Sequence, residues 1–225
     1  MNETKTQTSG GWKTTIIIFA VVFIVSFIYA FIRYNILRDV PLEQIPLFIT
    51  NKVFALSGTI LIGLSFLLGP LTRFWPHTFE QKLYLRKPLG VFGFGIAALH
   101  SFISLALLSP AYYGKFFLES GKLNLIGETS LLFGALALFI FSVVSLTSIP
   151  AIAAHLTPEQ WKSVQRLGYL AYAFVLVHVV VMGFRGWFES ASYLYGFISI
   201  SLISALFIIA VLLFRLAVIV FPKRD

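Results

Sequence analysis

The chain has 225 residues, of which 58% are hydrophobic and only 12% charged, and its formal net charge is +8. This composition is typical of an integral membrane protein and excludes an ordinary soluble domain. The basic residues form no single run or face, so nucleic-acid binding explains the charge poorly. The chain has no cysteine, which excludes disulfides, iron–sulfur clusters, thiolate ligation of haem and cysteine-based zinc sites.

Apolar runs long enough to cross a bilayer recur six times. A hydrocarbon core of about 30 Å needs about 20 helical residues. The sequence predicts spans at about 14–33, 52–71, 88–109, 127–149, 163–184 and 193–220. The first run exceeds the core of a signal peptide, about 7–15 residues, so we expect it to be retained. The predicted fold is an all-α integral membrane protein, a six-helix bundle over residues 13–225 with a disordered tail at 1–12.

The basic residues segregate between the two sides of this predicted bundle. With the N-terminus inside, the inner side holds Lys5, Lys13, Arg73, Lys82, Arg86, Lys87, Lys162, Arg166, Arg215, Lys223 and Arg224. The outer side holds Arg33, Arg38, Lys52, Lys115, Lys122 and Arg185. Because Lys and Arg are enriched in cytoplasmic loops, both termini are expected to be cytoplasmic.

Two of the four histidines lie deep inside apolar spans, His100 in the third and His178 in the fifth. A buried imidazole needs a partner, because an unsatisfied polar group in hydrocarbon costs several kcal/mol. Counted from Val91 and Leu167, where the hydrocarbon is expected to begin, His100 lies about 14 Å deep and His178 about 17 Å deep. The depths agree within one helical turn, so the two side chains can face each other across one cofactor.

Each histidine shares a helix face with small side chains spaced three and four residues apart. These are Gly90, Gly93 and Ala97 before His100, and Gly168, Ala171 and Val175 before His178. A flat porphyrin between two helices needs such a trough, and we expect Gly93, Ala97, Ala171 and Val175 to line it. The same stripes also suit plain close packing of membrane helices.

The ligand set favours haem over zinc. Two neutral imidazoles are too few for a structural zinc site, and all nine acidic residues lie in predicted loops, tails or helix ends. A bis-histidine haem needs only two protein ligands, because the porphyrin supplies the other four. The sequence therefore predicts one haem with His100 and His178 as axial ligands. Arg185, seven residues after His178, is either a partner of a haem propionate or an interfacial arginine.

Three stretches in this order resemble the ferric-reductase-like transmembrane family over roughly residues 50–185. They are LLGPLTRFWPHTFEQKLYLRKPLGVFGFGIAALHSFISL, SLTSIP and EQWKSVQRLGYLAYAFVLVH. Within the family they are most similar to the haem-binding membrane subunit of the bacterial periplasmic methionine-sulfoxide reductase system. The resemblance implies a bundle in the bacterial inner membrane with haem b on His100 and His178. It also implies electron transfer from a cytoplasmic donor or quinol to an outer acceptor, such as a periplasmic reductase partner.

One departure from the family affects the predicted number of haems. Gln165 stands where the family has a histidine, and Arg86 lies fourteen residues before His100, so the spans hold no inner histidine pair. The resemblance then implies one haem in the outer half. Electrons would enter near Arg86, Gln165 and Arg166, from FMN, a quinone pool or a partner. They would leave near the loops Ser109–Gly127 and Arg185–Tyr195.

Two other functions stay open alongside an electron-transfer subunit of a two-component reductase. One is direct reduction of ferric iron or a quinone by the chain itself. The other is a haem-free transporter or scaffold. No acid, lysine or proline lies at the centre of a span, which disfavours an ion-coupled carrier. The sequence shows no soluble flavin or nicotinamide domain, so a separate electron donor is expected.

Overall fold

The structure is a computed structural model that describes residues 2–189, 193 and 195–221, with side chains from residue 10 onward. The described residues form helices joined by short turns and one isolated β-bridge between Phe117 and Leu123. Within this part of the chain, six helices are long and apolar enough to cross a membrane, so the predicted six-helix architecture is confirmed. Lys223 and Arg224 lie outside the described residues, as do residues 190–192 and 194 of the predicted exit loop.

The spans are α1 (Asn2–Ala30), α2 (Thr50–Phe74), α4 (Arg86–Ala106), α6 (Leu125–Leu146), α8 (Pro158–Trp187) and α9 (Ile200–Val220). Between them lie the short helices α3 (Pro76–Phe79), α5 (Pro110–Tyr113) and α7 (Pro150–Ala153). Each of these three begins at a proline, which suits a first helical position because that backbone nitrogen needs no partner. The π-helical segments Phe31–Ile36 and Ile45–Ile49 and the 3₁₀ segments Leu42–Gln44, Glu80–Leu85 and Gly114–Phe116 complete the fold.

Helix α8 begins at a capping box, whereas α1 begins earlier in the chain than the sequence predicted. The Thr157 hydroxyl accepts from the Gln160 backbone N at 3.2 Å, and Gln160 Oε1 accepts from the Thr157 backbone N at 2.9 Å. This capping box, with Pro158 first in the helix, makes Thr157 the N-cap of α8. By contrast, α1 begins at Asn2, where the sequence predicted a disordered tail over residues 1–12. Extending a helix that the span has already nucleated costs far less than starting one.

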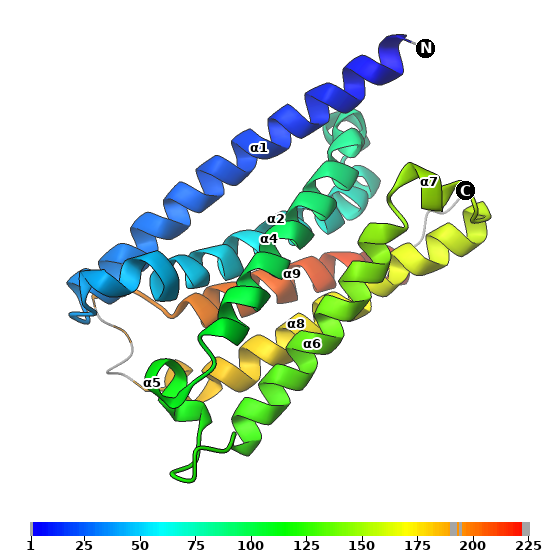
Figure 1. Ribbon diagram of the computed structural model, residues 1–225. Coiled ribbons are helices and arrows are strands. Elements are labelled where there is room, and N and C mark those ends of the chain that lie inside the picture. Colours follow the sequence, from blue (N-terminus) through cyan, green and yellow to red (C-terminus); the bar gives the residue numbers. More distant parts are fainter. Residues whose placement is uncertain (1, 190–192, 194, 222–225) are drawn as a thin grey trace.

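The α2 helix lies at the centre of the bundle, packed against α1, α4 and α9. The α8 helix packs against α6 and α9, so α9 joins the two halves. Figure 1 shows α2 beside α4, α6 beside α8, and α1 along the outside of the first pair. The main buried core contains Ile62 and Phe66 of α2, Phe141 of α6, Ala171 and Tyr172 of α8, and Ile208 and Val211 of α9.

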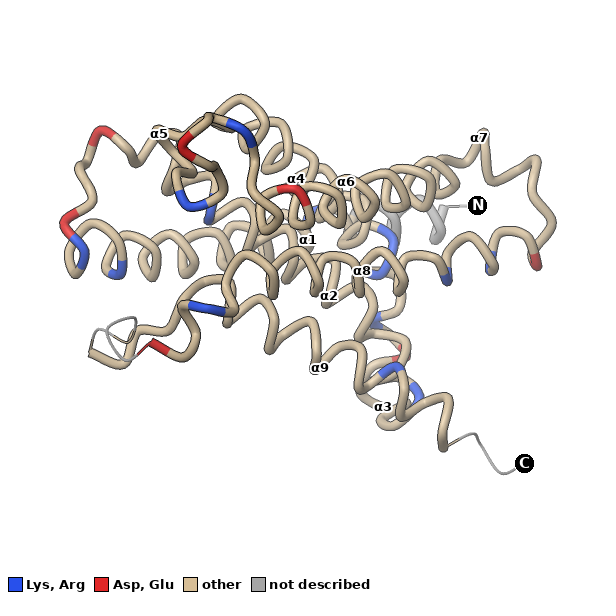
Figure 2. Tube along the Cα trace, turned by 90° about the horizontal axis from the view of Figure 1, so that it is seen from below, with Lys and Arg blue, Asp and Glu red and all other residues tan. Residues whose placement is uncertain are grey.

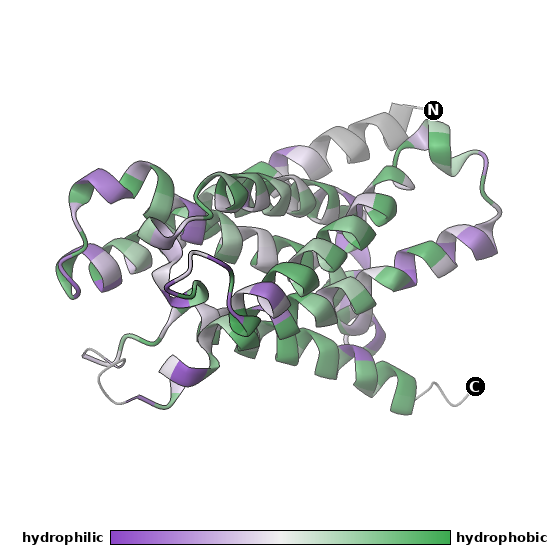
Figure 3. Ribbon diagram, turned by 60° about the horizontal axis from the view of Figure 1, so that its bottom comes forward, coloured by the Kyte–Doolittle hydropathy of each residue, from purple (hydrophilic) through white to green (hydrophobic). Residues whose placement is uncertain are grey.

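The two ends of the bundle are distinct. The start of α1, α3, α7 and the end of α9 lie together at one end, which we call the α7 end, and α5 lies at the opposite, α5 end (Figures 1 and 2). Charged residues gather toward both ends in Figure 2, while Figure 3 shows predominantly apolar spans between them. On α1, apolar side chains such as Ile17, Val21 and Val25 are more than half exposed, as expected for a helix that faces lipid.

The α5 end of α1 is tied to the segment that precedes α9. Arg33, only 2% exposed in the π-helical segment Phe31–Ile36, donates from a guanidinium nitrogen to the Phe197 carbonyl oxygen. The Tyr29 hydroxyl donates to the Ile198 carbonyl oxygen at 2.7 Å. The bond from the buried guanidinium to a backbone carbonyl helps to explain how this predicted outer charge is tolerated at the edge of a span.

Candidate functional site

His100 lies in α4, six residues before the helix ends at Ala106, and therefore toward the α5 end. Its Nδ1 lies 2.9 Å from the side-chain Oδ1 of Asn51 and 3.2 Å from the backbone O of the same residue, in α2. A longer contact of 3.4 Å joins Nδ1 to the Ser104 hydroxyl one turn further along α4. The half-buried imidazole is thus held by a neighbouring helix through one ring nitrogen.

Hydrogen bonds at Asn51 fix which end of its amide faces His100. Asn51 is 1% exposed, and its Nδ2 donates to the Ser104 hydroxyl at 2.8 Å and to the Tyr113 hydroxyl at 3.4 Å. Since Nδ2 carries the two donors, Oδ1 is the acceptor that remains for His100. Nδ1 of His100 therefore carries its proton, and Nε2 carries the lone pair.

His178 lies in α8, nine residues before the helix ends at Trp187. Its Nδ1 donates to the backbone O of Ser130 in α6 at 2.8 Å, with the Ser130 hydroxyl 3.0 Å away. One turn along α6, a Cβ on Gly134 would lie 3.0 Å from Nδ1 and 3.3 Å from Cε1 of this ring. The absence of a side chain at Gly134 therefore allows the Nδ1 edge of the imidazole to approach α6 closely.

The two histidines share one arrangement. Both use Nδ1 as a donor toward an adjacent helix, and no hydrogen bond of the described residues involves either Nε2. The rings lie close enough to interact electrostatically. Metal-ligating histidines characteristically donate the other ring N–H to a carbonyl or carboxylate, which fixes the tautomer and raises ligand basicity. This donor set fits a metal group that needs two axial imidazoles.

The small residues predicted to line a trough divide between two surroundings. A Cβ on Gly93 would lie 2.9 Å from Leu61 Cβ and 3.0 Å from the Ile62 backbone N, so this glycine serves the close packing of α4 on α2. Ala171 is fully buried in the main core, and Ala97 and Val175 pack against that core from α4 and α8. The structure thus brings Ala97, Ala171 and Val175 to one cluster, while Gly93 faces α2; their place beside a porphyrin stays a prediction.

Basic side chains surround the α5 end of this site. Lys52, next to Asn51, places Nζ 4.1 Å from the ring centroid of Phe48 and acts electrostatically on His100. Lys115 donates from Nζ to the Met182 carbonyl oxygen at 2.9 Å, and loss of hydration together with the neighbouring Lys52 ammonium lowers the pKa of Lys115. Arg185, predicted to pair with a propionate, is exposed in the last turn of α8.

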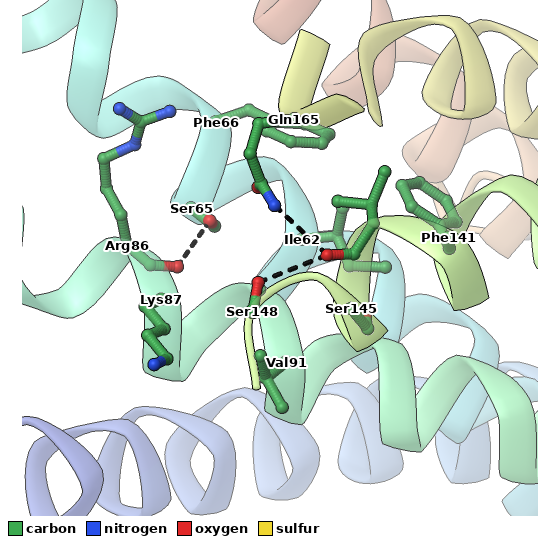
Figure 4. A pocket seen from close by; sticks show the side chains of 12 residues that line it. Ile62, Ser65, Phe66, Arg86, Lys87, Val91, Phe141, Ser145, Ser148 and Gln165 are labelled. Carbon is green, nitrogen blue, oxygen red and sulfur yellow. Dashed lines mark hydrogen bonds between the residues drawn. The ribbon is translucent and has the colours of Figure 1, made fainter. Parts of the chain in front are cut away.

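A second feature lies toward the α7 end, where α2, α4, α6 and α8 enclose a pocket of about 50 Å³ (Figure 4). Arg86 and Gln165, both predicted where electrons enter, line it together with Ser65, Phe66 and Lys87. Gln165 Nε2 donates to the Val144 carbonyl oxygen and to the Thr147 hydroxyl, each at 3.1 Å. The pocket is far smaller than the roughly 300–1,000 Å³ typical of ligand sites.

The remaining predicted residues near the α7 end lie at the surface. Arg166 is exposed on α8 and is not among the residues that line the pocket. His77 in α3 and His155 after α7 are both exposed. The structure therefore brings together one predicted pair at the α7 end, Arg86 and Gln165.

Three residues that hold the histidines were not predicted from the sequence. Asn51 and Ser130 are buried polar residues within or at the start of apolar helices, a signal that marks them for attention because each needs a partner. That signal does not indicate which partner they meet. Gly134 carries no local signal at all, since a glycine in a membrane helix is common.

The comparisons with known proteins indicate a transmembrane family. The family described as ferric reductase like transmembrane component matches residues 54–176, more than half of the 225. The chain belongs to this family. The match includes His100, ends at residue 176, two residues before His178, and confirms the family predicted from the three stretches. The finer resemblance, to a subunit of a methionine-sulfoxide reductase system, stays a prediction.

Curated relatives are metalloreductases. Metalloreductase STEAP2 of Homo sapiens is 25% identical over 213 residues, covering 81% of this chain and 44% of the relative. The Mus musculus protein of that name is 24% identical over the same length. Metalloreductase STEAP3 of Rattus norvegicus is 25% identical over 199 residues, covering 72% of this chain and 41% of the relative. The chain thus spans less than half the length of these relatives.

Proposed function

We propose that this chain is a transmembrane electron-transfer protein that holds one haem b between His100 and His178. The observation that carries the proposal is the matched use of the two rings. Each donates Nδ1–H to an adjacent helix and leaves Nε2 for a metal. Membership of a ferric-reductase-like family supports a membrane reductase or electron-transfer role for such a site.

A haem held by His100 and His178 would supply an iron that accepts and donates single electrons. Such a centre has no open position for a substrate, so it suits passage of single electrons. The residues of this chain supply the rest. Asn51 and Ser130 orient the imidazoles, and the apolar core around Tyr172 excludes water from the α7 side of the site.

On the donor side we propose that electrons enter at the α7 end, which we place in the cytoplasm by the distribution of Lys and Arg. Phe66 lines the pocket there and stacks on Tyr169 with ring centroids 4.6 Å apart. It also packs against Phe141 and Tyr172, so side chains are continuous from the pocket to the core beside the histidines. Because the pocket is small, the ring of FMN or a quinol would reach only its mouth, beside Arg86.

On the acceptor side we propose that electrons leave at the α5 end, on the periplasmic face of a bacterial inner membrane. The resemblance of the three sequence stretches to a methionine-sulfoxide reductase subunit favours a periplasmic reductase partner as the acceptor. The name of the curated relatives favours a second candidate, in which the chain itself reduces a metal ion such as ferric iron.

The decisive experiment is a reduced-minus-oxidised spectrum of the purified chain with quantification of haem. We expect a sharp reduced b-type band and one haem per chain. His100→Ala and His178→Ala should each abolish the band, whereas His77→Ala and His155→Ala, at exposed loop sites, serve as matched controls. A colourless wild-type protein would support the haem-free scaffold instead, and two haems per chain would overturn the single-site assignment.

The two acceptors can be separated with the reduced, haem-loaded protein. Rapid reoxidation by a ferric chelate alone would favour direct metal reduction. Reoxidation that requires an added periplasmic reductase fraction would favour the two-component system. The measurement is the decay rate of the reduced band after mixing in a stopped-flow instrument.

A further inference from the structure

The two histidines are held by different kinds of acceptor. His178 donates to the backbone O of Ser130 at 2.8 Å, an acceptor that no substitution removes. His100 donates to the side-chain Oδ1 of Asn51 at 2.9 Å, and the Asn51 backbone O at 3.2 Å is only a weaker second acceptor. The environment of one ligand therefore depends on one side chain, whereas that of the other depends on the main chain.

The side-chain amide of Asn51 is oriented by contacts other than the one with His100. It is buried near the start of α2 and donates at 2.8 Å to Ser104, which lies one turn after His100 in α4. A second contact of 3.4 Å reaches the hydroxyl of Tyr113 in α5. These contacts prevent the amide from rotating and presenting Nδ2 to the imidazole. Asn51 thus links α2, α4 and the loop at the α5 end around a single ring nitrogen.

We propose that Asn51 is a positioning residue for His100, fixing its tautomer and setting the donor strength of Nε2 and thereby the midpoint potential of the haem. The inference rests on the proposed function, because it concerns the haem that His100 would bind. An oxygen that accepts from Nδ1–H gives the imidazole partial anionic character and makes Nε2 a stronger donor. A stronger donor stabilises ferric iron more than ferrous iron, so it lowers the midpoint potential.

The test compares three variants of the full-length, haem-loaded protein. Asn51→Leu keeps similar bulk and removes the side-chain acceptor, so that only the weaker backbone acceptor at 3.2 Å remains. Asn51→Asp keeps an oxygen that can accept from Nδ1–H. Ser57→Ala is the matched control, because Ser57 is a fully buried α2 residue whose hydroxyl makes no hydrogen bond to the described residues. The readouts are the midpoint potential from a spectroelectrochemical titration, the haem-to-protein ratio and the low-spin ferric electron paramagnetic resonance spectrum.

We expect Asn51→Leu to raise the midpoint potential and to weaken haem binding roughly 10- to 100-fold, the usual cost of removing such a partner. Asn51→Asp should restore the haem content, with a potential at or below that of the wild type. Ser57→Ala should match the wild type in all three readouts. If Asn51→Leu fails to fold, Ser104→Ala serves instead, because it frees the Asn51 amide and should shift the potential in the same direction by less.

Two results would overturn the inference. One is wild-type potential and haem content in Asn51→Leu, and the other is an equal upward shift in Asn51→Leu and Asn51→Asp. Both are distinguishable from failure of the proposed function. If the wild-type chain holds no haem, the proposed function and the inference fall together. If His100→Ala loses haem while the midpoint potential and haem content of the Asn51 variants equal those of the wild type, only the positioning role is refuted.

Discussion

Gly134→Ala is the smallest change that tests the geometry of the site. The substitution adds one methyl group in α6, directly against the His178 ring. The new Cβ would lie 3.0 Å from Nδ1, 3.3 Å from Cε1 and 3.7 Å from Cγ. The ring cannot simply move away, because Nδ1 is bonded to the Ser130 backbone O in the same helix at 2.8 Å.

The expected magnitude follows from these distances. Non-bonded heavy atoms prefer separations of about 3.5–4.0 Å, so the ring or α6 must shift by roughly 0.5 Å. Overpacking of this kind costs about 1–3 kcal/mol. If that cost falls on haem binding, affinity drops roughly 5- to 150-fold, because each 1.4 kcal/mol corresponds to about a factor of ten. The fold should survive, since alanine is also a better helix former than glycine.

The assay is haem titration of the purified apoprotein, followed by the reduced band, with thermal stability measured in parallel. Gly95→Ala is the matched control, because a Cβ there meets nothing within 4 Å in the middle of α4. Gly168→Ala is a packing control, because its Cβ would lie 2.8 Å from Phe66 Cζ and would not touch a histidine. Wild-type haem affinity in Gly134→Ala, or an equal loss in Gly95→Ala, would refute the reasoning.

Three further outcomes are expected. Ser130→Ala should change haem content by less than about twofold, because the backbone acceptor of His178 remains; a loss as large as that of His178→Ala would contradict this. Lys52→Met should lower the haem midpoint potential, because it removes a positive charge that acts on His100, while the exposed Lys122→Met leaves the potential unchanged in the same titration. Gln165→His should leave one haem per chain by haem quantification, and a second haem would contradict the packing described below.

The sequence predicts the six-helix architecture and draws attention to His100 and His178, because both features leave strong local signals. Runs of about 20 apolar residues are required wherever a helix crosses hydrocarbon, and a histidine in such a run stands out against its neighbours. The cap at Thr157 is also local, since its partners lie within three residues. Gly93 shows the limit of this reasoning. Its spacing suits a porphyrin trough and helix packing equally, and only the neighbouring α2 helix shows the close contact it makes.

The acceptors of the histidines could not be predicted, because each comes from a helix remote in sequence. Asn51 lies 49 residues before His100, and Ser130 lies 48 before His178. Their contacts depend on the rotation of α2 and α6 about their axes, which the packing of whole helix faces decides. In the lipid phase apolar faces are less constrained by water than in a soluble core, so periodicity fixes that rotation only weakly.

In the proposed function, packing in the α7 half of the bundle would close a second haem site, in addition to the absence of a ligand at Gln165. Gln165 is held by the Val144 carbonyl oxygen and the Thr147 hydroxyl, both near the end of α6. One turn along α8, the Phe66 ring fills the space beside Gly168 and stacks on Tyr169. A histidine at 165 would therefore find neither a facing imidazole among the described residues nor room for a porphyrin. In the proposed function, this aromatic packing takes the position of a second redox centre and connects the pocket to the single haem.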